Sequence, residues 1–540
     1  MLRGYSKIEF IVPFSLISTT LFITPFSSYD PINLIKLICI SIGGALSFWA
    51  IWANRRLLLL KGNAFITLIV GFYLCWSIIS YFFSGVSKLD GLYGVFGRNS
   101  GLISVASLAL LMLLSVITSS RQNTRLISIV LVFTGFLSGC YGLIQSVGLD
   151  PYDWTTEYTP VFGFFGNPNF QSSFMALTAT SAVLLIFDQN SWLKKSILLL
   201  TVTLSVFNIY KTNSQQGFIV FLITVSIGLY LVFRNKYRSP IFDILFVSVS
   251  IVGLIAILMD LLRKSPWQSV IYEESVSYRG DFWRAAWQMA TNNPIFGVGP
   301  GGFRDNYMRY RDQTAASRPF VEDITDSAHN YFLDIASTGG IPLLLAYIII
   351  NILVLKKVIQ ILIQKNPIQY QMIAVIVCWI GFTIQSLISI DNIALNIWGW
   401  VLAGFIIGYK LEDEPKVKFK DSGNYFLAGS LLILALFLTG KQFQNDFSFR
   451  NAVEKSDVVQ IKQSGLNWPQ DTYRMNFISK ILRENGFESE GLEVVKKSIE
   501  INSSNVESWK ELSRFNSITP SDKSLAEKNI EILDPFGSKS

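Results

Sequence analysis

Apolar segments long enough to cross a bilayer recur along the chain from residue 8 to residue 440. A transmembrane helix needs about 20 predominantly apolar residues, and polar, charged connections separate the segments here. The pattern predicts an all-α, polytopic membrane domain over residues 1–440, with about 12 to 13 spans. The predicted spans are residues 8–26, 33–53, 64–83, 101–119, 125–146, 169–187, 196–210, 216–233, 241–262, 339–355, 370–390, 395–409 and 424–440.

One long polar segment, residues 263–330, interrupts this series. It contains the single histidine of the chain, His329, and a group of arginines: Arg279, Arg284, Arg304, Arg309, Arg311 and Arg318. Its acidic residues balance its basic ones, so the segment is not a polybasic membrane patch. Long loops are usually either functional or disordered. Because this one is rich in aromatic residues and glycines, we expect it to be folded and functional.

The charges of the connections predict the orientation in the membrane. Most basic residues lie in alternate connections: Arg3, Lys7, Arg55, Arg56, Lys61, Arg121, Arg125, Lys194, Lys195, Arg234, Lys236, Arg238, Lys356, Lys357, Lys365, Lys410, Lys416, Lys418 and Lys420. The other short connections hold only Lys36, Lys88, Arg98 and Lys211. Basic residues are enriched in cytoplasmic loops. We therefore expect a cytoplasmic N-terminus, with residues 263–330 and the C-terminal region on the outer face.

The region from about 441 to 540 changes character, with dense charge and helical apolar spacing. Trp468–Pro469, Asn502–Ser503 and Asp534–Pro535 recur at intervals of 34 and 32 residues. The repeat resembles a short tetratricopeptide array of helical hairpins, so residues 441–540 are predicted to form an exported helical repeat domain. Such arrays offer a surface for a protein partner. The alternative is a solvated helical cap, and the sequence leaves both open.

The composition agrees with a membrane protein and excludes several other classes. The chain is 51% hydrophobic and 15% charged, against about 25% charged residues in soluble proteins. The loop charges account for the net charge of +7, so it does not indicate a nucleic-acid partner. The cysteines lie inside apolar segments and are predicted to be core residues rather than a disulfide framework: Cys39, Cys75, Cys140 and Cys378. One histidine and no CxxC motif predict no metal site, and the first apolar segment is expected to be a retained span.

Within the outer loop, the text YRGDFWRAAWQMATNNPIFGVGPGGFRDNY, followed by SAHNYFLDIASTGGIPLLL, resembles the O-antigen ligase/polymerase family. The shared pattern comprises an arginine with a tryptophan four residues later, P-x-x-G-x-G-x-x-x-F, and a His-Asn dipeptide at the start of a span. The matching positions are Arg279, Trp283, Pro294, Gly297, Gly299, Phe303, His329 and Asn330. GRNSG at residues 97–101 and FGNPNF up to Phe170 resemble further family signatures, so the resemblance covers roughly residues 90–410.

The resemblance implies a GT-C-like membrane glycosyltransferase in the bacterial plasma (inner) membrane, metal-independent and without a cofactor. It would move a glycan from an undecaprenyl diphosphate carrier to an acceptor on a lipid, a growing glycan or a protein. Histidine is a natural general base near neutral pH, and arginine pairs with phosphate oxygens through parallel hydrogen bonds. We expect His329 to accept the acceptor's proton and Arg279 to bind the diphosphate, with Arg98, Arg284 and Arg304 as assisting candidates.

One departure from the family pattern concerns a second arginine expected at the outer end of a middle span. The matching text here is TNSQQGF, where Gln215 stands near that position. Lys211, one turn earlier, is the remaining candidate for diphosphate binding, although a lysine lacks the fork geometry of arginine.

Simpler interpretations remain for each of these residues. His329 could cap the helix that follows, and Arg279 and Arg284 could lie on an interfacial helix that reaches lipid headgroups. The run Gly297 to Gly302 is interpreted as a turn that allows close helix packing, since no Lys-Ser/Thr follows it, and Asp391 as structural. The alternative function is a transporter of a lipid-linked sugar or a small anion, but few charges lie inside the spans and no half-repeat is apparent.

Overall fold

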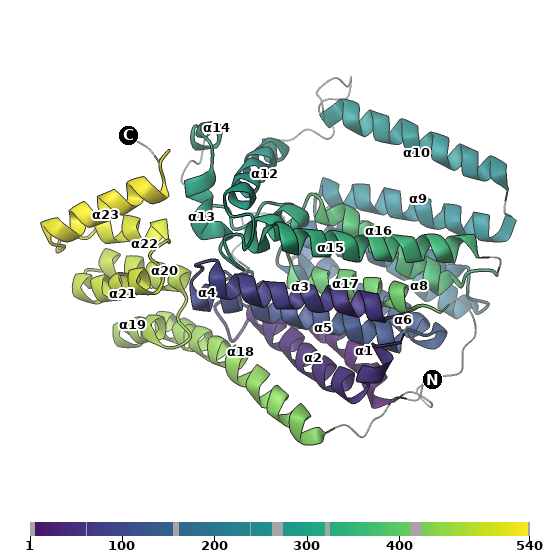
Figure 1. The fold of residues 1–540 in the computed structure, drawn as a ribbon, viewed down its shortest axis with the longest axis horizontal. Helices are drawn as coiled ribbons and strands as arrows, with labels where there is room; N and C mark the ends of the chain where they lie inside the picture. The colour runs from purple at the N-terminus through teal and green to yellow at the C-terminus, as the bar shows by residue number, and fades with distance from the viewer. Residues whose placement is uncertain are drawn as a thin grey trace.

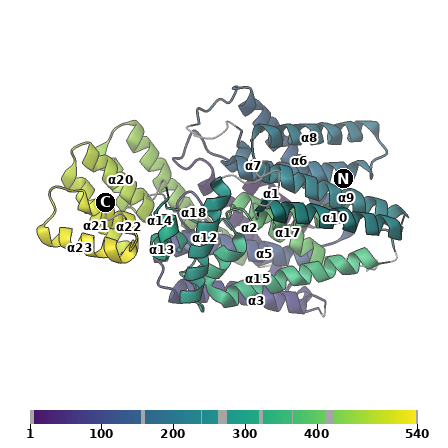
Figure 2. The ribbon, with the colours of Figure 1, turned by 90° about the horizontal axis from the view of Figure 1, so that it is seen from above.

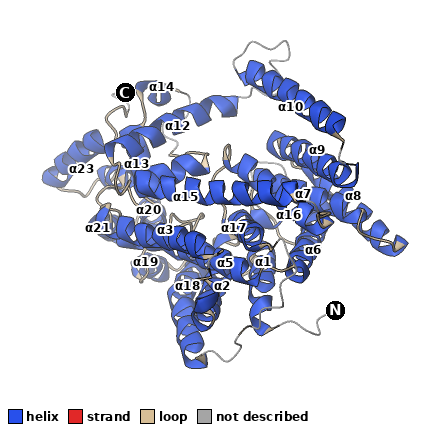
Figure 3. Cartoon of the chain, turned by 45° about the vertical axis from the view of Figure 1, so that its right-hand side comes forward, coloured by secondary structure: helices blue, strands red, loops and turns tan. Residues whose placement is uncertain are grey.

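The structure, a computed structural model, describes residues 6–60, 62–154, 161–237, 239–261, 274–318, 324–364, 366–410, 419 and 424–537. Every regular element in these ranges is a helix, and they contain no strand (Figure 3). Most helices run roughly along the long axis of the molecule in one bundle, and a smaller helical group lies at one end of it (Figure 1). The chain thus has the all-α, multi-pass membrane architecture that the apolar pattern predicts.

A helix of the bundle lies on each predicted span. The bundle helices are α1 (Ile11–Leu21), α2 (Asn33–Ala53), α3 (Ala64–Phe83), α5 (Leu102–Thr118), α6 (Arg121–Ser146), α7 (Pro168–Ile186), α8 (Trp192–Lys211), α9 (Gln215–Tyr237), α10 (Pro240–Leu261), α15 (Tyr331–Ile363), α16 (Tyr370–Ser386), α17 (Ile393–Gly408) and α18 (Tyr425–Glu454). In the described ranges, 8 helices are long and apolar enough to cross a membrane. The shorter α5, α16 and α17 are also apolar, as is α10 over Pro240–Gly253.

The first span differs most from its prediction. The sequence predicts residues 8–26, but α1 has only 11 residues. A 3₁₀ turn, η1 (Lys7–Phe10), precedes it because Ser6 and Glu9 form a capping box, in which the Ser6 N–H donates to Glu9 Oε2 at 2.7 Å. The helix ends where Phe22 adopts extended backbone, with ψ 130°.

Helix α17 lies at the centre of the bundle and is buried from Ile393 to Ile406. Small residues allow it to approach α5, since a Cβ on Gly404 or Gly408 would lie 2.5 or 2.1 Å from the carbonyl oxygen of Met112 or Val116. In contrast, α10 packs on α9, and most of its described side chains are exposed. Figure 1 shows α10 at the edge of the bundle, where an apolar surface suits contact with lipid.

The cysteine prediction is only partly correct. All four thiols are free, and Cys39 and Cys378 are buried as expected. Cys140 is partly exposed, and Cys75 is exposed on the surface of α3. An apolar segment does not distinguish the face of a membrane helix that packs on other helices from the face that meets lipid, because both are apolar.

Helix α15 is kinked at Gly340, which has φ 77° and ψ 177°. The kink frees backbone groups that the glycine-rich turn of the outer loop then satisfies. The Ile341 N–H donates to the Pro294 carbonyl at 2.8 Å, and the Val298 N–H donates to the Ser337 carbonyl at 2.8 Å. From α3, the Trp76 indole N–H donates to the Ile295 and Gly339 carbonyls at 3.2 and 3.1 Å.

The glycines of this turn act in packing, as the sequence analysis predicts. Gly297 has φ +63°, and a Cβ there would lie 2.5 Å from the Ser337 carbonyl oxygen. Gly301 has φ +72°, and a Cβ there would lie 2.6 Å from the carbonyl oxygen of Asp90. Only glycine combines these backbone conformations with such close approach. The interpretation of the run as a tight turn is therefore confirmed.

The described part of the outer loop is folded around this turn. It contains α12 (Glu274–Asn292), α13 (Phe303–Tyr310) and the short α14 (Gln313–Ala316). The remaining short elements of the membrane domain are η2 (Arg55–Leu57), α4 (Lys88–Tyr93) and η3 (Gly163–Phe165).

The C-terminal region forms antiparallel helical hairpins beside the end of the bundle (Figure 2). After α18 come α19 (Val458–Leu466), α20 (Thr472–Glu484), α21 (Glu488–Ile501), α22 (Val506–Ser513) and α23 (Pro520–Leu533). Asp471 and Asn505 occupy equivalent positions, as the N-caps of α20 and α22. The predicted boundary at residue 440 falls within α18, which runs without interruption from the bundle into the hairpins, where Phe449 packs on Met475 and Ile478.

Candidate active site

His329 lies where the outer loop meets α15. Its backbone is left-handed, with φ 53°, and its N–H donates to Ser327 Oγ at 3.1 Å. The following residue, Asn330, is the N-cap of α15, because its Oδ1 accepts from the N–H groups of Phe332 and Leu333 at 3.0 and 3.1 Å. The alternative in which His329 caps this helix is therefore wrong.

The imidazole of His329 packs on α12. Its ring centroid lies 5.2 Å from that of Phe282, with the planes tilted by 33°. Arg279 precedes Phe282 by three residues, so both side chains leave α12 on neighbouring positions of one face. Trp283 and Trp287 lie on an adjacent face and are 37% and 55% exposed. One helix can thus direct Arg279 to the site and its tryptophans to the membrane interface.

The surroundings of His329 favour the neutral imidazole. Burial, together with the charges of Arg279 and Arg98, lowers the pKa of His329 to about 4, and the carboxylate of Asp326 opposes this shift. Because a charged imidazole would face two guanidinium groups in a poorly solvated place, the ring is neutral at neutral pH. A neutral imidazole has a nitrogen lone pair that can accept a proton.

Arg98 reaches the same place from a second segment of the chain. It belongs to a tight turn in which Gly94 and Gly97 have φ 84° and 79°. Arg98 Nε lies 2.7 Å from Asp326 Oδ2. Although burial raises the pKa of Asp326, the Arg98 guanidinium brings it below its usual range. The pair uses one of five guanidinium N–H groups, so others can still bind a ligand.

A small cavity lies beside the Arg98–Asp326 pair. Its volume is about 80 Å³, and its lining includes Arg98, Ser100, Asp326, Tyr331, Asp334 and Asp391. This space has room for a few water molecules but is too small for a whole sugar residue. Burial raises the pKa of Asp391 to about 7, against the opposing charge of Arg98.

Two acidic residues of this site escaped the sequence analysis. Asp391 was expected to be structural but lines the cavity. Asp334 binds the N–H of Ala328 through Oδ1 at 2.6 Å, next to His329. In the described ranges, no group of His, Cys, Asp or Glu is arranged to hold a metal ion.

Of the other predicted diphosphate ligands, two form ion pairs and one is exposed, but the charge of Arg304 still acts on the site, since it helps to lower the pKa of Asp326. Arg284 binds Asp312 at 2.6 Å and also pairs with Asp281. Arg304 binds Glu507 of the C-terminal hairpins at 2.7 Å. Lys211 is exposed at the end of α8, where its ammonium group lies 5.8 Å from the ring centroid of Phe207. The structure thus brings together His329, Arg279 and Arg98 from the predicted set.

The FGNPNF segment forms the start of α7 near the site of the missing family arginine. Asn167 caps α7, and its side chain accepts from the Asn169 N–H. Asn169 Oδ1 accepts from Ser214 Oγ at 2.8 Å, directly before Gln215. The signature therefore lies beside the TNSQQGF text, and its asparagines have a local structural role.

Fold and site together define a multi-pass helical membrane protein with a histidine–arginine cluster at one end of its bundle. A family model described as O-Antigen ligase matches residues 199–348. The matched segment extends from α8 into α15 and includes Arg279, the glycine-rich turn and His329. None of the curated proteins compared with the chain matches it significantly. The match supports a membrane ligase of the glycosyltransferase type in general terms.

Proposed function

We propose that the protein transfers a glycan from a polyprenyl diphosphate carrier, of the undecaprenyl type, to an acceptor hydroxyl at the outer face of the bacterial plasma membrane. The observation that carries the proposal is the convergence of a neutral imidazole, His329, with the guanidinium groups of Arg279 and Arg98. The three side chains come from separate segments, and both arginines lie close enough to lower the pKa of His329. The family match supports the same class of reaction.

The chemistry needs a base and a site for a leaving diphosphate. The acceptor oxygen attacks the anomeric carbon and loses its proton to His329, while the bond to the diphosphate oxygen breaks and that oxygen keeps the electron pair. Arg279 and Arg98 stabilise the developing negative charge. Attack opposite the leaving group inverts the anomeric centre. The proposal uses no metal and no cofactor.

The location of the site agrees with transfer outside the cytoplasm. Arg98 and His329 lie at the end of the bundle that carries the C-terminal hairpins, whereas most basic connections lie at the other end. With the basic end in the cytoplasm, the site faces outward, where the lipid-linked donor would be presented. The acceptor could be a lipid, a growing glycan or a protein.

Complementation of a deletion strain, with a gel of surface glycans, tests the proposal. We expect His329→Ala to lower glycan transfer about 10²- to 10⁴-fold, the usual range for loss of a general base, and Arg279→Ala to lower it at least tenfold. Arg309→Ala is the matched control, because Arg309 is an exposed arginine of the same loop. Full transfer by both site variants at normal protein levels would disprove the mechanism, and flipping of the donor without transfer would favour the transporter.

A further inference from the structure

The C-terminal hairpins contact the turn that holds Arg98 and also helix α13 of the outer loop, whose Tyr307 packs edge-on against Phe282, the ring that contacts His329. Tyr473, in the first turn of α20, stacks on Phe96, with ring centroids 5.8 Å apart. The guanidinium carbon of Arg304 lies 4.2 Å from the centroid of the same tyrosine ring. Phe96 precedes Arg98 by two residues, and Arg304 lies on α13 of the outer loop. One side chain of the C-terminal region therefore lies between the two segments.

Asn502 forms a second connection of the same kind. Its Nδ2 donates to Asp90 Oδ2 at 3.1 Å and to Asp305 Oδ2 at 2.6 Å. Asp90 lies on α4, directly before the turn that holds Arg98, and Asp305 lies on α13. Since an amide NH₂ group has two hydrogens, it can satisfy both carboxyl groups at once and hold α4 and α13 at a fixed distance.

Ion pairs fix the outer loop to the hairpins. Arg304 Nη2 lies 2.7 Å from Glu507 Oε2. Arg311 Nη2 lies 2.7 Å from Asp534 Oδ1, with side-chain exposures of 2% and 0%. Removal of one partner from a buried pair leaves an uncompensated charge, which is strongly unfavourable. The buried Arg311–Asp534 pair therefore resists separation of the loop from the hairpins.

The same contact has an apolar core. One cluster of buried residues joins Met289, Phe303 and Tyr307 of the loop to Trp509 and Phe515 of the hairpins. A continuous core of this kind is typical of parts that fold together rather than of a tethered module.

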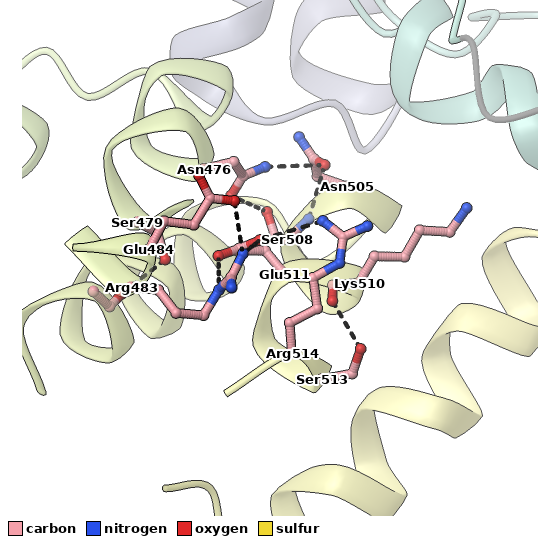
Figure 4. Close-up of polar contacts among 11 residues, drawn as sticks. Asn476, Ser479, Arg483, Glu484, Asn505, Ser508, Lys510, Glu511, Ser513 and Arg514 are labelled. Carbon is pink, nitrogen blue, oxygen red and sulfur yellow. Dashed lines mark hydrogen bonds and ion pairs between the residues drawn. The ribbon is translucent and has the colours of Figure 1, made fainter. Parts of the chain in front are cut away.

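A network of polar contacts joins α20 to α22 near these residues (Figure 4). Arg483 of α20 binds Glu511 of α22 through two hydrogen bonds at 2.8 and 3.3 Å. Ser508 Oγ donates to Asn476 Oδ1 at 2.9 Å. This network fixes α22, and with it Glu507, against α20, which carries Tyr473.

We propose that the C-terminal hairpins are a clamp that sets the distance between Arg98 and His329, with Tyr473, Asn502 and Glu507 as positioning residues. The inference rests on the proposed function and assigns the hairpins a role in the reaction itself. It also assigns Arg304 to the clamp rather than to the diphosphate. A shift of about 1 Å in reacting groups can cost 10²-fold in rate, so a small loosening of the clamp would affect turnover.

The test compares Tyr473→Ala, Tyr473→Phe and Glu507→Gln in the full-length protein, with Phe487→Ala as the matched control, since Phe487 is an exposed aromatic residue of the hairpins. We expect Tyr473→Ala and Glu507→Gln to lower kcat at least tenfold, with the donor KM within twofold of the wild type. Tyr473→Phe keeps the stacked ring and should stay within threefold of the wild type, as should Phe487→Ala. If Arg304 bound the diphosphate instead, Glu507→Gln would release the Arg304 side chain for that role and leave kcat unchanged or higher.

Hydrogen exchange of residues 90–101 and 303–311 provides a readout that does not depend on activity. The clamp predicts faster exchange in both segments for Tyr473→Ala and Glu507→Gln, and unchanged exchange for Tyr473→Phe. Unchanged exchange in all variants, or an effect on KM alone, would overturn the clamp. If the wild type and His329→Ala both fail to transfer glycan while exchange responds as expected, the proposed function fails and the mechanical coupling stands.

Discussion

At the scale of single residues, the charge of His329 determines when it can act as a base. Two guanidinium groups and burial lower its pKa to about 4. The bound diphosphate would bring negative charge beside Arg279 and Arg98 and so weaken their effect on the imidazole. Under the proposed mechanism, His329 is a weak base in the free protein and a stronger one when the donor is bound.

The lowered pKa of His329 predicts the pH dependence of the proposed reaction. A histidine must be neutral to accept a proton, and it is neutral above its pKa, so a lowered pKa moves the loss of activity to lower pH. The acid limb of kcat/KM, which reports the free enzyme, should lie below pH 5, well under the ordinary value of about 6.5. The acid limb of kcat should lie at higher pH, because the donor is bound. Steady-state rates between pH 4 and 8 check this, and a kcat/KM limb at 6.5 or above would contradict it.

The residue types of the site could be read from the sequence, but their pairing could not. His329, Arg279 and Arg98 stand out because the chemistry of the family pattern needs a base and fixed cations. The partner of Arg98 is 228 residues away in the chain, and that of Arg304 is 203 residues away. No local pattern links such positions, because the fold alone brings them together. The position of Asp391 could not be predicted either: in the sequence it lies in a short loop, and in the structure its side chain lines the cavity.

At the scale of elements, the kink of α15 is the joint that fixes the outer loop to the bundle. The apolar pattern predicts a span from residue 339, whereas helical structure begins at Tyr331 and bends at Gly340. Hydropathy could not predict the first part, because a short amphipathic arm ahead of a span has too few apolar residues. The text STGGIP does indicate a break, since glycine and proline interrupt helices.

We predict that Gly340→Ala destabilises the protein by roughly 3 kcal/mol or more, the sum of a strained positive φ and a backbone clash. The added Cβ would lie 2.2 Å from the Ile295 carbonyl oxygen, at φ +77°. A thermal melt in detergent measures the effect as a lower Tm. Gly429→Ala is the control, because nothing lies within 4 Å of a Cβ there and alanine favours the helix. Equal melting temperatures for the two variants would show that the kink needs no glycine.

At the scale of the whole molecule, a group of acidic residues lies at the contact between the membrane domain and the hairpins. Burial raises the pKa of Asp305 to about 6. Burial, with the neighbouring charges of Asp305 and Asp471, raises the pKa of Asp90 well above its usual range. Arg304 and Glu507 also face this group. A raised carboxyl pKa means that the docked state holds protons that a separated state releases.

Docking of the hairpins should therefore weaken as pH rises. The stabilisation from Asp305 is fully present below the ordinary aspartate pKa of about 3.9 and is lost as pH rises through about 6. Hydrogen exchange in α22, corrected for its intrinsic dependence on pH, should be at least twofold faster at pH 8 than at pH 5. The double variant Asp90→Asn/Asp305→Asn should show no such difference. A pH effect of equal size in that variant would place the responsible groups elsewhere.

The general architecture was accessible from the sequence, since apolar length alone indicates a membrane helix. In the helical hairpins Asp471 and Asn505 are equivalent N-caps, and the tetratricopeptide-like repeat stays a prediction. The close packing of the hairpins on the outer loop could not be predicted from the sequence. The sequence of the hairpins indicates the period of the predicted repeat. It does not show that Asn502 and Glu507 contact the outer loop, because they resemble ordinary solvated polar residues.

Helix α18 is a continuous helix that connects the membrane domain to the hairpins. Its 30 residues form one unbroken rod, about 45 Å long at 1.5 Å per residue. Its first turn lies near the basic end of the bundle, and its last turn packs among the hairpins. A rod without a joint transmits tilt, so a displacement at the first turn of α18 moves the hairpins at its other end. Changes in the thickness or lateral pressure of the bilayer would therefore be felt at the end of the bundle that holds His329.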